Sequence, residues 1–236
     1  MSHPQRHPRR PSTSRPLANR HRVAGFSFIE ILVVMGIIAV LVGIGIGVYV
    51  IAFRKTPIFK TQALVASLST QIAQWHSQYR AYPPGDLTRV TLATGLPIKV
   101  AKLPNTTNMG IESVYQCLSL PGVNNGLTIS ESDASNYDGD ALDKAVASNG
   151  NATLYEIRDA WGNPLVYFED RDYVQAEKDP PTYINGSGPG SEEPGDAVHP
   201  KPWRLATGGF AQPGRFQLFS MGEDGIPNTD DDIKSW

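Results

Sequence analysis

Four aspartates lie within nine residues near the C-terminus, at Asp224, Asp230, Asp231 and Asp232. Carboxylates at this density repel one another unless water or a cation lies between them. An oxygen-rich cluster suits Ca²⁺, which binds about six to eight oxygen ligands at about 2.3–2.6 Å, backbone carbonyls included. The spacing differs from that of an EF-hand, which requires D-x-[DN]-x-[DN]-G and a distant Glu. From the residues alone, a calcium site and an Asx-rich turn are equal alternatives.

A fifth carboxylate, Glu30, lies inside an apolar run. The 28 residues from Phe26 to Phe53 carry no other charge, which is enough for a helix to cross a bilayer core of about 30 Å. A carboxylate in hydrocarbon costs about 2.5–3.5 kcal/mol on insertion scales, so Glu30 needs a partner. No Lys or Arg lies nearby in this run, but cleavage after Gly25 would create a cationic amine on Phe26, four residues before Glu30.

A cleavable secretory signal explains the run less well. The apolar region of such a signal is about 7–15 residues long, and its small-residue cleavage site follows that region. Here the small residue, Gly25, precedes the apolar residues. A buried helix of a soluble protein is the other, disfavoured alternative.

The charges are distributed unevenly along the chain. Residues 1–25 contain six arginines and no acidic residue, a composition that cannot form a buried core. Removing these six from the 21 basic residues leaves 15 against 23 acidic ones. A nucleic-acid partner is therefore not expected, because phosphate binding requires clustered Lys and Arg. Directly before an apolar span, the basic tract instead predicts the cytoplasmic side of a membrane, with a nucleic-acid tail as the disfavoured alternative.

Catalytic side chains do not form a recognisable pattern. There is no Ser-His-Asp, Cys-His or histidine-rich metal motif. Three of the five histidines lie in the N-terminal tract, and His76 and His199 are far apart. The single cysteine, Cys117, excludes an intrachain disulfide and is interpreted as a small buried apolar residue. We therefore expect a protein that is not an enzyme.

The apolar run continues into an amphipathic stretch, and together they predict one long helix over residues 28–80. Large apolar side chains recur there at steps of three or four residues, as on one face of a helix. They are Leu64, Leu68, Ile72, Trp75 and Tyr79. Pro57 is expected to kink or interrupt this helix, and Pro83-Pro84-Gly85 ends it.

The remaining chain predicts a mixed domain. Residues 110–119 predict a short helix, residues 159–164 a tight turn, and residues 165–168 and 215–220 strands. Residues 179–202 are rich in Pro, Gly and acidic residues and are interpreted as a loop.

A second acidic group occupies residues 130–143. A second cation site is one interpretation, and we favour a solvated loop, as is usual for runs of charge. The acidic residues in this stretch are Glu131, Asp133, Asp138, Asp140 and Asp143.

The N-terminal residues resemble a known signal. Residues 22–34 read RVAGFSFIEILVV, with a basic leader, Gly25, Phe26, a triplet, Glu30 and a long apolar helix. This order resembles the class III signal of type IV pilins and type II secretion pseudopilins. The resemblance implies cleavage after Gly25 by a prepilin peptidase and N-methylation of Phe26, which keeps the positive charge. It also implies that Glu30 pairs with the Phe amine of a neighbouring subunit and sets the register of assembly.

Two further segments resemble the major pseudopilin of type II secretion. Residues 159–167 match D-x-W-G-N-P-x-x-Y, and residues 220–233 are similar to the S-x-G-x-D-G loop with a D-D-I ending that binds calcium in that family. The resemblance implies a calcium loop over residues 218–233. Its candidate ligands are side-chain oxygens of Asp224, Asp231 and either Asp230 or Asp232, and carbonyl oxygens of Leu218, Met221 and Asn228 or Thr229.

The resemblance implies an α+β, type IV pilin-like fold. A long N-terminal helix, with a membrane-spanning half and an amphipathic half, would pack on a small antiparallel sheet with extended loops. The expected domains are a leader, residues 1–25, that is removed; a transmembrane and filament-core helix, residues 26–53; and a periplasmic globular domain, residues 54–236. The middle of the chain, residues 86–158, is longer than a compact pseudopilin requires.

The implied function is that of a structural subunit of a type II secretion pseudopilus, which exports folded proteins. The implied partners are copies of the same chain, minor pseudopilins, the prepilin peptidase, the inner-membrane assembly platform and membrane lipid. The chain would be a single-pass protein of the bacterial inner membrane, with a cytoplasmic N-terminus and a periplasmic C-terminal domain, before it joins a periplasmic filament. The alternatives are a type IV pilin for adhesion, motility or DNA uptake, and a membrane-anchored enzyme or binding module with a prepilin-like signal.

Overall fold

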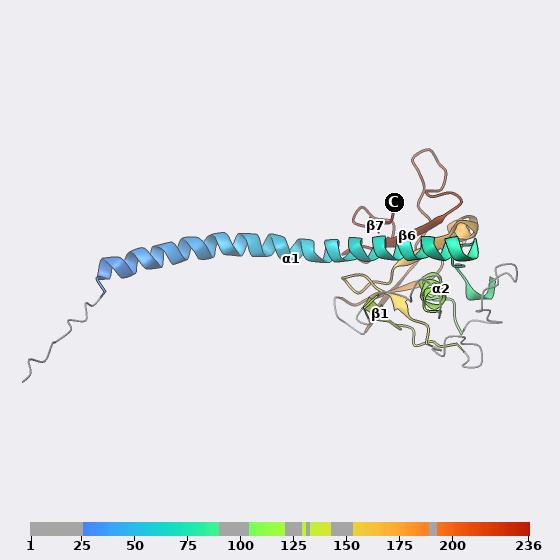
Figure 1. Cartoon of the computed structure of the whole chain (residues 1–236), viewed down its shortest axis with the longest axis horizontal. Helices are drawn as coiled ribbons and strands as arrows, with labels where there is room; N and C mark the ends of the chain where they lie inside the picture. The colour runs from blue at the N-terminus through green and yellow to red at the C-terminus, as the bar shows by residue number, and fades with distance from the viewer. Residues whose placement is uncertain (1–25, 90–103, 121–128, 131–132, 143–152, 189–192) are drawn as a thin grey trace, which may run out of the picture. The chain divides into compact units, whose positions relative to one another are not determined.

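The structure, a computed structural model, describes residues 26–89, 104–120, 129–130, 133–142, 153–188 and 193–236. The predicted leader, residues 1–25, lies outside this description, as do the side chains of residues 44–54 and 89. The chain divides into two compact units, Met1–Tyr49 and Val50–Trp236. Figure 1 shows the chain coloured by residue number, with several of its elements labelled.

The first helix, α1 (Phe28–Tyr79), is 52 residues long and continues through Pro57 without interruption. Its end agrees with the predicted range, residues 28–80. From residue 26 to residue 43 every side chain is exposed. Among the residues that the structure describes, none of the helices meets both the length and the apolarity that a membrane span requires. The span predicted over residues 26–53 includes side chains that are not described, and it stays a prediction.

The C-terminal part of α1 contributes one side of the core of the second unit. Leu68, Ile72 and Trp75 are completely buried, and Leu64 and Tyr79 pack against the same core. This confirms the apolar stripe predicted from the spacing. A polar contact also fastens the helix, because the Thr61 hydroxyl accepts a hydrogen bond from the Ala160 amide at 3.1 Å. The face of α1 whose apolar side chains recur every three or four residues is thus the face that the domain covers.

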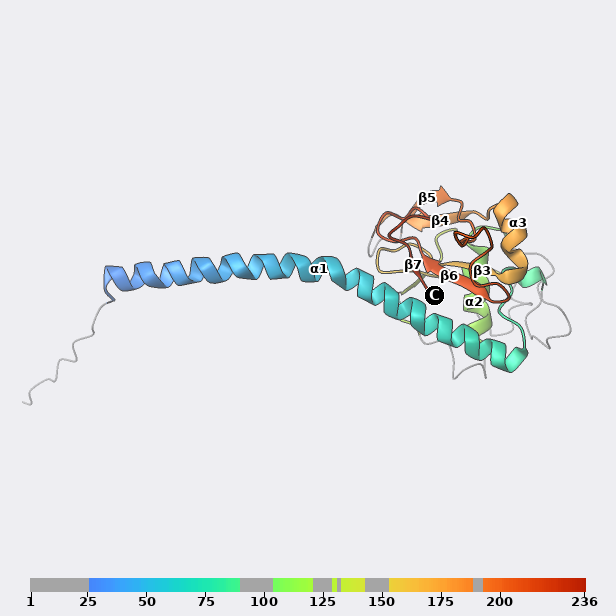
Figure 2. The same cartoon turned by 90° about the horizontal axis from the view of Figure 1, so that it is seen from above.

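A three-stranded antiparallel sheet forms the centre of this unit. Its strands are β3 (Val166–Glu169), β6 (Phe216–Ser220) and β7 (Ile233–Lys234), in the order β3-β6-β7. Tyr167 in β3 lies opposite Leu218 in β6. In Figure 2 the sheet lies between the C-terminal part of α1 and the β4–β5 pair. All five residues of β6 are buried, as expected for a central strand covered on both faces.

Smaller elements surround the sheet. They are η1 (Leu87–Arg89), α2 (Met109–Leu118), η4 (Asp170–Asp172) and α3 (Tyr173–Lys178), with a two-stranded antiparallel sheet of β1 (Ala134–Ser135) and β2 (Glu156–Ile157). Helix α2 packs against β2 and β3. The predicted short helix and both predicted strands are confirmed. A long N-terminal helix with small antiparallel sheets is the expected α+β, type IV pilin-like fold.

The interpretation of residues 179–202 as a loop is wrong for residues 183–186 and 194–198. Strand β4 (Tyr183–Gly186) pairs antiparallel with β5 (Pro194–Val198). Side-chain hydrogen bonds add to its ladder: Asn108, outside the pair, accepts through Oδ1 from the Ile184 amide at 2.9 Å, and Asn185 of β4 accepts through Oδ1 from the Asp196 amide of β5 at 2.6 Å. Pro194 is tolerated because it is the first residue of its strand. Tertiary hydrogen bonds therefore override the weak local preference for a strand.

Candidate functional site

The predicted processing site lies at the edge of the described chain. Gly25 is outside the described residues, and Phe26 is 78% exposed. The Ser27 amide donates to Glu30 Oε2 at 3.4 Å, and the Glu30 amide donates to the Ser27 carbonyl at 3.0 Å. A Glu three residues after the N-cap commonly satisfies the free amide there in this way, as part of a capping box. Glu30 therefore has a local role at the start of α1 that the S-x-x-E spacing signals and our sequence analysis missed.

In the C-terminal acidic loop, Asp231 is the residue around which the backbone folds. Its Oδ2 accepts hydrogen bonds from the amides of Glu223 at 2.8 Å and Asp224 at 3.2 Å. Its Oδ1 accepts from the Thr229 hydroxyl at 2.6 Å. Burial alone would raise the pKa of Asp231, but these hydrogen bonds outweigh it and lower the pKa. Gly222 makes this approach possible, because a Cβ there would collide with the Asp231 carboxylate.

The other three aspartates of the loop have different environments. Asp232 is only 8% exposed, and its Oδ2 accepts from the Asn228 amide at 2.9 Å. Burial raises the pKa of Asp232 to about 6. Asp224 and Asp230 are exposed, and Asp224 Oδ1 accepts from the Ile226 amide at 2.8 Å. Asp224 and Asp232 thus each accept a hydrogen bond from a backbone amide of the loop.

The positions of the oxygen atoms in the C-terminal loop can be compared with those that a calcium site requires. In the described part of the chain, the one group of three or more acidic side chains with ligand atoms close enough to share a metal lies elsewhere, at Glu112, Asp138 and Glu156. Of the predicted carbonyl ligands, that of Leu218 accepts from the Ser235 amide at 3.0 Å, and Met221 is fully buried. The hydrogen bonds of the loop are those of an Asx-rich turn. Its carboxylate and carbonyl oxygens are nevertheless of the kind that Ca²⁺ binds. The calcium loop stays a prediction.

The segment that matches D-x-W-G-N-P-x-x-Y holds this loop in place. Asp159 accepts from the amides of Trp161 and Asn163, both at 2.9 Å, and from the Ser220 hydroxyl at 2.5 Å. Burial raises the pKa of Asp159 to about 6, although these hydrogen bonds oppose the rise. Asn163 then donates from Nδ2 to the Gly222 carbonyl at 2.9 Å. Two segments far apart in the sequence therefore form one hydrogen-bonded unit.

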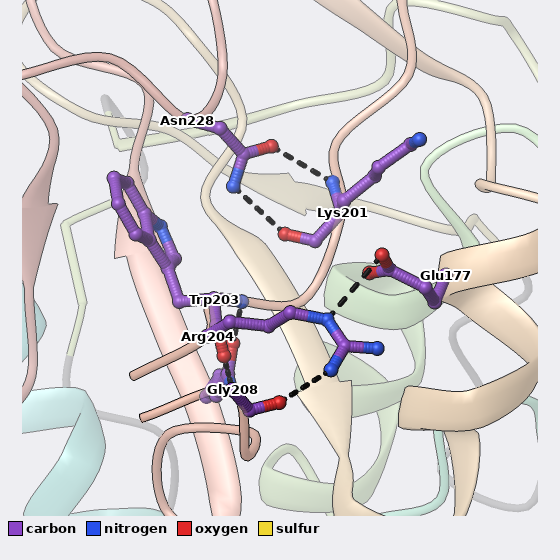
Figure 3. A network of polar contacts seen from close by, with 7 residues as sticks. Glu177, Lys201, Trp203, Arg204, Gly208 and Asn228 are labelled. Atoms are coloured by element: carbon purple, nitrogen blue, oxygen red, sulfur yellow. Dashed lines mark hydrogen bonds and ion pairs between the residues drawn. The ribbon is translucent and has the colours of Figure 1, made fainter. Parts of the chain in front are cut away.

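A second attachment lies on the other side of the loop (Figure 3). The Asn228 side chain accepts from the Lys201 amide and donates to the Lys201 carbonyl, both at 2.9 Å. Asn228 has a φ of 69°, a left-handed conformation that Asn adopts more easily than most residues. Beside it, the Lys234 ammonium lies 3.3 Å from the centre of the Trp203 ring. The loop is therefore fixed to the segment that precedes β6 as well as to the turn before β3.

Replacing Asn163 with alanine should destabilise the domain, because it leaves the carbonyl of Gly222 without this donor. A buried carbonyl without a partner costs about 1–3 kcal/mol, which lowers Tm by roughly 2–12 °C in a protein of this size. Thermal unfolding of the full chain in detergent measures the effect. Gln78→Ala, on the exposed side of α1, is the control. An unchanged Tm in Asn163→Ala would contradict the role assigned to this amide.

Sequence analysis weighed a second cation site in the acidic stretch at residues 130–143 but favoured a solvated loop, whereas the structure buries acidic side chains there. In the acidic group that forms around this stretch, the side chains with ligand oxygens close together are Glu112, Asp138 and Glu156, and the charge of Asp140 also acts on Glu112. The interpretation of the acidic stretch at 130–143 as a solvated loop is wrong for Asp140, which is 8% exposed, and for Asp133, which is buried and pairs with Lys60 at 2.7 Å. Glu131 and Asp143 lie outside the described residues.

Without a bound cation, the negative charges of the carboxylates in this acidic group repel one another. Burial, followed by the charges of Asp140, Asp138 and Glu156, raises the pKa of Glu112 to about 10. Burial is also the largest cause that raises the pKa values of Asp140 and Glu156 to about 7. The acidic stretch contained a signal for part of this group, but Glu112 lies on a different element, so its participation could not be read from local sequence.

Comparison with known families supports the N-terminal interpretation. Residues 20–46 match the model of the prokaryotic N-terminal methylation motif. No curated protein and no solved structure matches the chain. The motif indicates a type IV pilin-like protein, a pilus or pseudopilus subunit that a prepilin peptidase processes and that self-assembles into a filament after anchoring in the membrane. Proteins that carry this signal are structural rather than enzymatic.

Proposed function

We propose that the chain is the major structural subunit of a type II secretion pseudopilus. The methylation motif at residues 20–46 places it among pilin-like proteins without distinguishing a pilus from a pseudopilus. The finer assignment is carried by one observation: the Asp159–Asn163 turn is hydrogen-bonded to Ser220 and Gly222 of the C-terminal acidic loop. These are the two segments that resemble the major pseudopilin. Their contact means that they act as one structural unit rather than as two separate resemblances.

The N-terminal helix supports the same proposal through its surface. The side chains from residue 26 to residue 43 are exposed in the single chain, and nearly all are apolar. An apolar surface of this extent requires cover, because soluble monomers rarely expose such patches. We propose the inner-membrane bilayer as the first cover, with a cytoplasmic N-terminus and a periplasmic globular domain, and neighbouring copies of α1 in the filament as the second. The further partners would be minor pseudopilins and the assembly platform.

Deletion of the gene in its native bacterium tests the proposal. Export of folded proteins across the outer membrane should fall to background and return on complementation, whereas twitching motility and DNA uptake should remain. Loss of motility or DNA uptake with normal export would instead assign the chain to a type IV pilus. Normal behaviour in all three assays, with no filament, would favour a membrane-anchored binding module or enzyme.

We further propose that the C-terminal loop binds Ca²⁺ in the assembled protein. The Asp224 amide already contacts Asp231 Oδ2 at 3.2 Å, so these two predicted ligands belong to one turn. Side-chain oxygens of Asp224, Asp231 and either Asp230 or Asp232, with carbonyls of Leu218 and Met221, would hold the ion. Bound calcium would neutralise the charge that the four aspartates concentrate there.

Asp224→Ala should remove the calcium-dependent rise in Tm that this loop contributes. A cation at about 100 times its Kd stabilises a protein of this size by about 5–10 °C in Tm, because it binds only the folded state. Differential scanning calorimetry of the full chain in detergent, with calcium or chelator, measures the rise. Glu223→Gln, the neighbouring exposed carboxylate that is not a predicted ligand, is the matched control. An identical rise in Asp224→Ala and the unmutated chain would exclude Asp224 as a ligand.

A further inference from the structure

A second cluster of carboxylates lies inside the domain, apart from the C-terminal loop. Glu112 comes from α2, Glu156 from β2, and Asp138 from the segment after β1. One ligand oxygen from each of these three residues lies within 4.8 Å of the other two. Asp140 is not one of these three ligands, but it is near enough for its charge to raise the pKa of Glu112. Three separate parts of the chain therefore direct acidic side chains to one place.

Neighbouring groups position two of these carboxylates from outside the cluster. Glu156 Oε1 accepts from Asn108 Nδ2 at 2.9 Å, and both Glu156 oxygens lie 3.2 Å from the Tyr137 amide. Asp138 Oδ2 accepts from Asn105 Nδ2 at 2.8 Å. Such outer hydrogen bonds are typical of carboxylates that are held ready to bind a cation, because they fix the side chain while leaving lone pairs free.

The oxygens that remain have no partner. Within the described residues, Glu112 Oε1, Asp138 Oδ1 and both carboxylate oxygens of Asp140 are buried and make no hydrogen bond. Glu112 is only 3% exposed and Asp140 only 8%. No ion pair to any of the four carboxylates exists in that part of the chain. Buried oxygen acceptors are normally hydrogen-bonded or bound to a cation. The unpaired oxygens of this cluster therefore favour binding of a cation.

We propose that Glu112, Asp138 and Glu156 bind a hard divalent cation, most readily Ca²⁺. The ligand set consists of carboxylate oxygens, with neither His nor Cys, which favours Ca²⁺, Mg²⁺ or Mn²⁺ over Zn²⁺ or Cu²⁺. Ca²⁺ tolerates irregular geometry and several carboxylates, whereas Mg²⁺ requires a near-ideal octahedron. The bound ion connects α2 to the β1–β2 pair and to the segment that carries Asp138 and Asp140. The site does not depend on the secretion function proposed above.

Protonation of the carboxylates is the alternative to a bound cation as a way to neutralise this cluster. The raised pKa of Glu112 means that the cluster without a cation retains at least one proton at neutral pH. Replacing a carboxylate of the cluster with its amide separates the two cases, through the Tm in chelator and through calcium binding. Glu112→Gln has nearly the same shape and removes one buried charge, so it should fold in chelator with a Tm equal to or above that of the unmutated chain. If the cluster binds a cation, the same variant should lose calcium binding.

The experiment uses the full mature chain in detergent at neutral pH, with Asp224→Ala present to suppress the C-terminal loop. Equilibrium dialysis with Ca²⁺ should give one bound ion per chain, and calcium should raise Tm by about 5–10 °C at 100 times its Kd. Adding Glu112→Gln or Asp138→Asn should remove both the bound ion and the rise. Asp179→Asn, which removes one exposed carboxylate near the end of α3, should remove neither.

The outcomes separate the two sites. Binding that survives Asp224→Ala and disappears with Glu112→Gln supports the cluster. Absence of calcium binding in the Asp224→Ala chain, or binding that persists in both cluster variants, overturns it. If Glu112→Gln fails to fold, Asp138→Asn decides the question, because Asp138 lies outside α2 and an asparagine oxygen there can still accept the hydrogen bond from Asn105.

Discussion

Filament assembly should fall sharply when Glu30 is replaced by leucine, while the chain still inserts in the membrane. We expect this because the Glu30 carboxylate is proposed to pair with the Phe26 amine of a neighbouring copy. If pairing recovers the insertion cost of about 2.5–3.5 kcal/mol, its loss weakens each subunit contact roughly 100-fold. Membrane fractionation measures insertion, and sedimentation of sheared filaments measures assembly.

The control for this experiment comes from the hydrogen bonds at the start of α1. Glu30 Oε2 also accepts from the Ser27 amide, so Glu30→Leu removes a helix cap together with the charge. Glu30→Gln keeps the capping geometry, because Gln serves in a capping box as Glu does, and removes only the charge. Both variants should fail to assemble if the charge sets the register. Normal filaments from Glu30→Gln with none from Glu30→Leu would assign Glu30 to the helix cap instead.

Gly25→Leu should prevent removal of the leader altogether. A leucine side chain places bulk directly beside the bond that the prepilin peptidase is proposed to cut, between residues 25 and 26. Mass spectrometry of the membrane fraction should then find a chain that retains its first 25 residues, with no methylated Phe26. Val23→Leu, which adds bulk further from the bond, should be processed normally.

The two experiments are linked through the Phe26 amine. An uncut chain has no such amine, so Gly25→Leu should lose assembly as completely as Glu30→Leu. Combining the two substitutions should add no further loss, since both remove the same pair. A mature chain beginning at Phe26 in the Gly25→Leu variant, or filaments built from uncut chains, would remove the basis for the assembly model.

Local sequence is enough to predict the elements whose signals are local. The repeat of Leu68, Ile72 and Trp75 predicted which face of α1 is buried, and the Pro83-Pro84-Gly85 run predicted where the helix ends. The strand at residues 216–220 and helix α2 followed from short apolar patterns in the same way. These predictions are correct because side-chain periodicity and helix stops depend on neighbours within a few residues.

The hairpin of β4 and β5 shows where this reasoning fails. Its sequence is rich in Gly and Pro and has weak strand propensity, yet the side-chain oxygens of Asn108 and Asn163 accept hydrogen bonds from the amides of Ile184 and Gly186. Strand propensity depends strongly on context, and here the context comes from residues more than a dozen positions away. The composition of residues 179–202 therefore indicated a loop where tertiary contacts stabilise a ladder.

The sequence by itself determined the processing signal, the long helix with its buried face and the presence of acidic groups, because each is a property of adjacent residues. Only the tertiary structure decided which carboxylates meet. Glu112 joins Asp138 and Glu156 because α2 packs on β2, and Asp231 turns inward because Gly222 leaves room for it. Electrostatic environment depends on distance and burial in space, and neither follows from spacing along the chain.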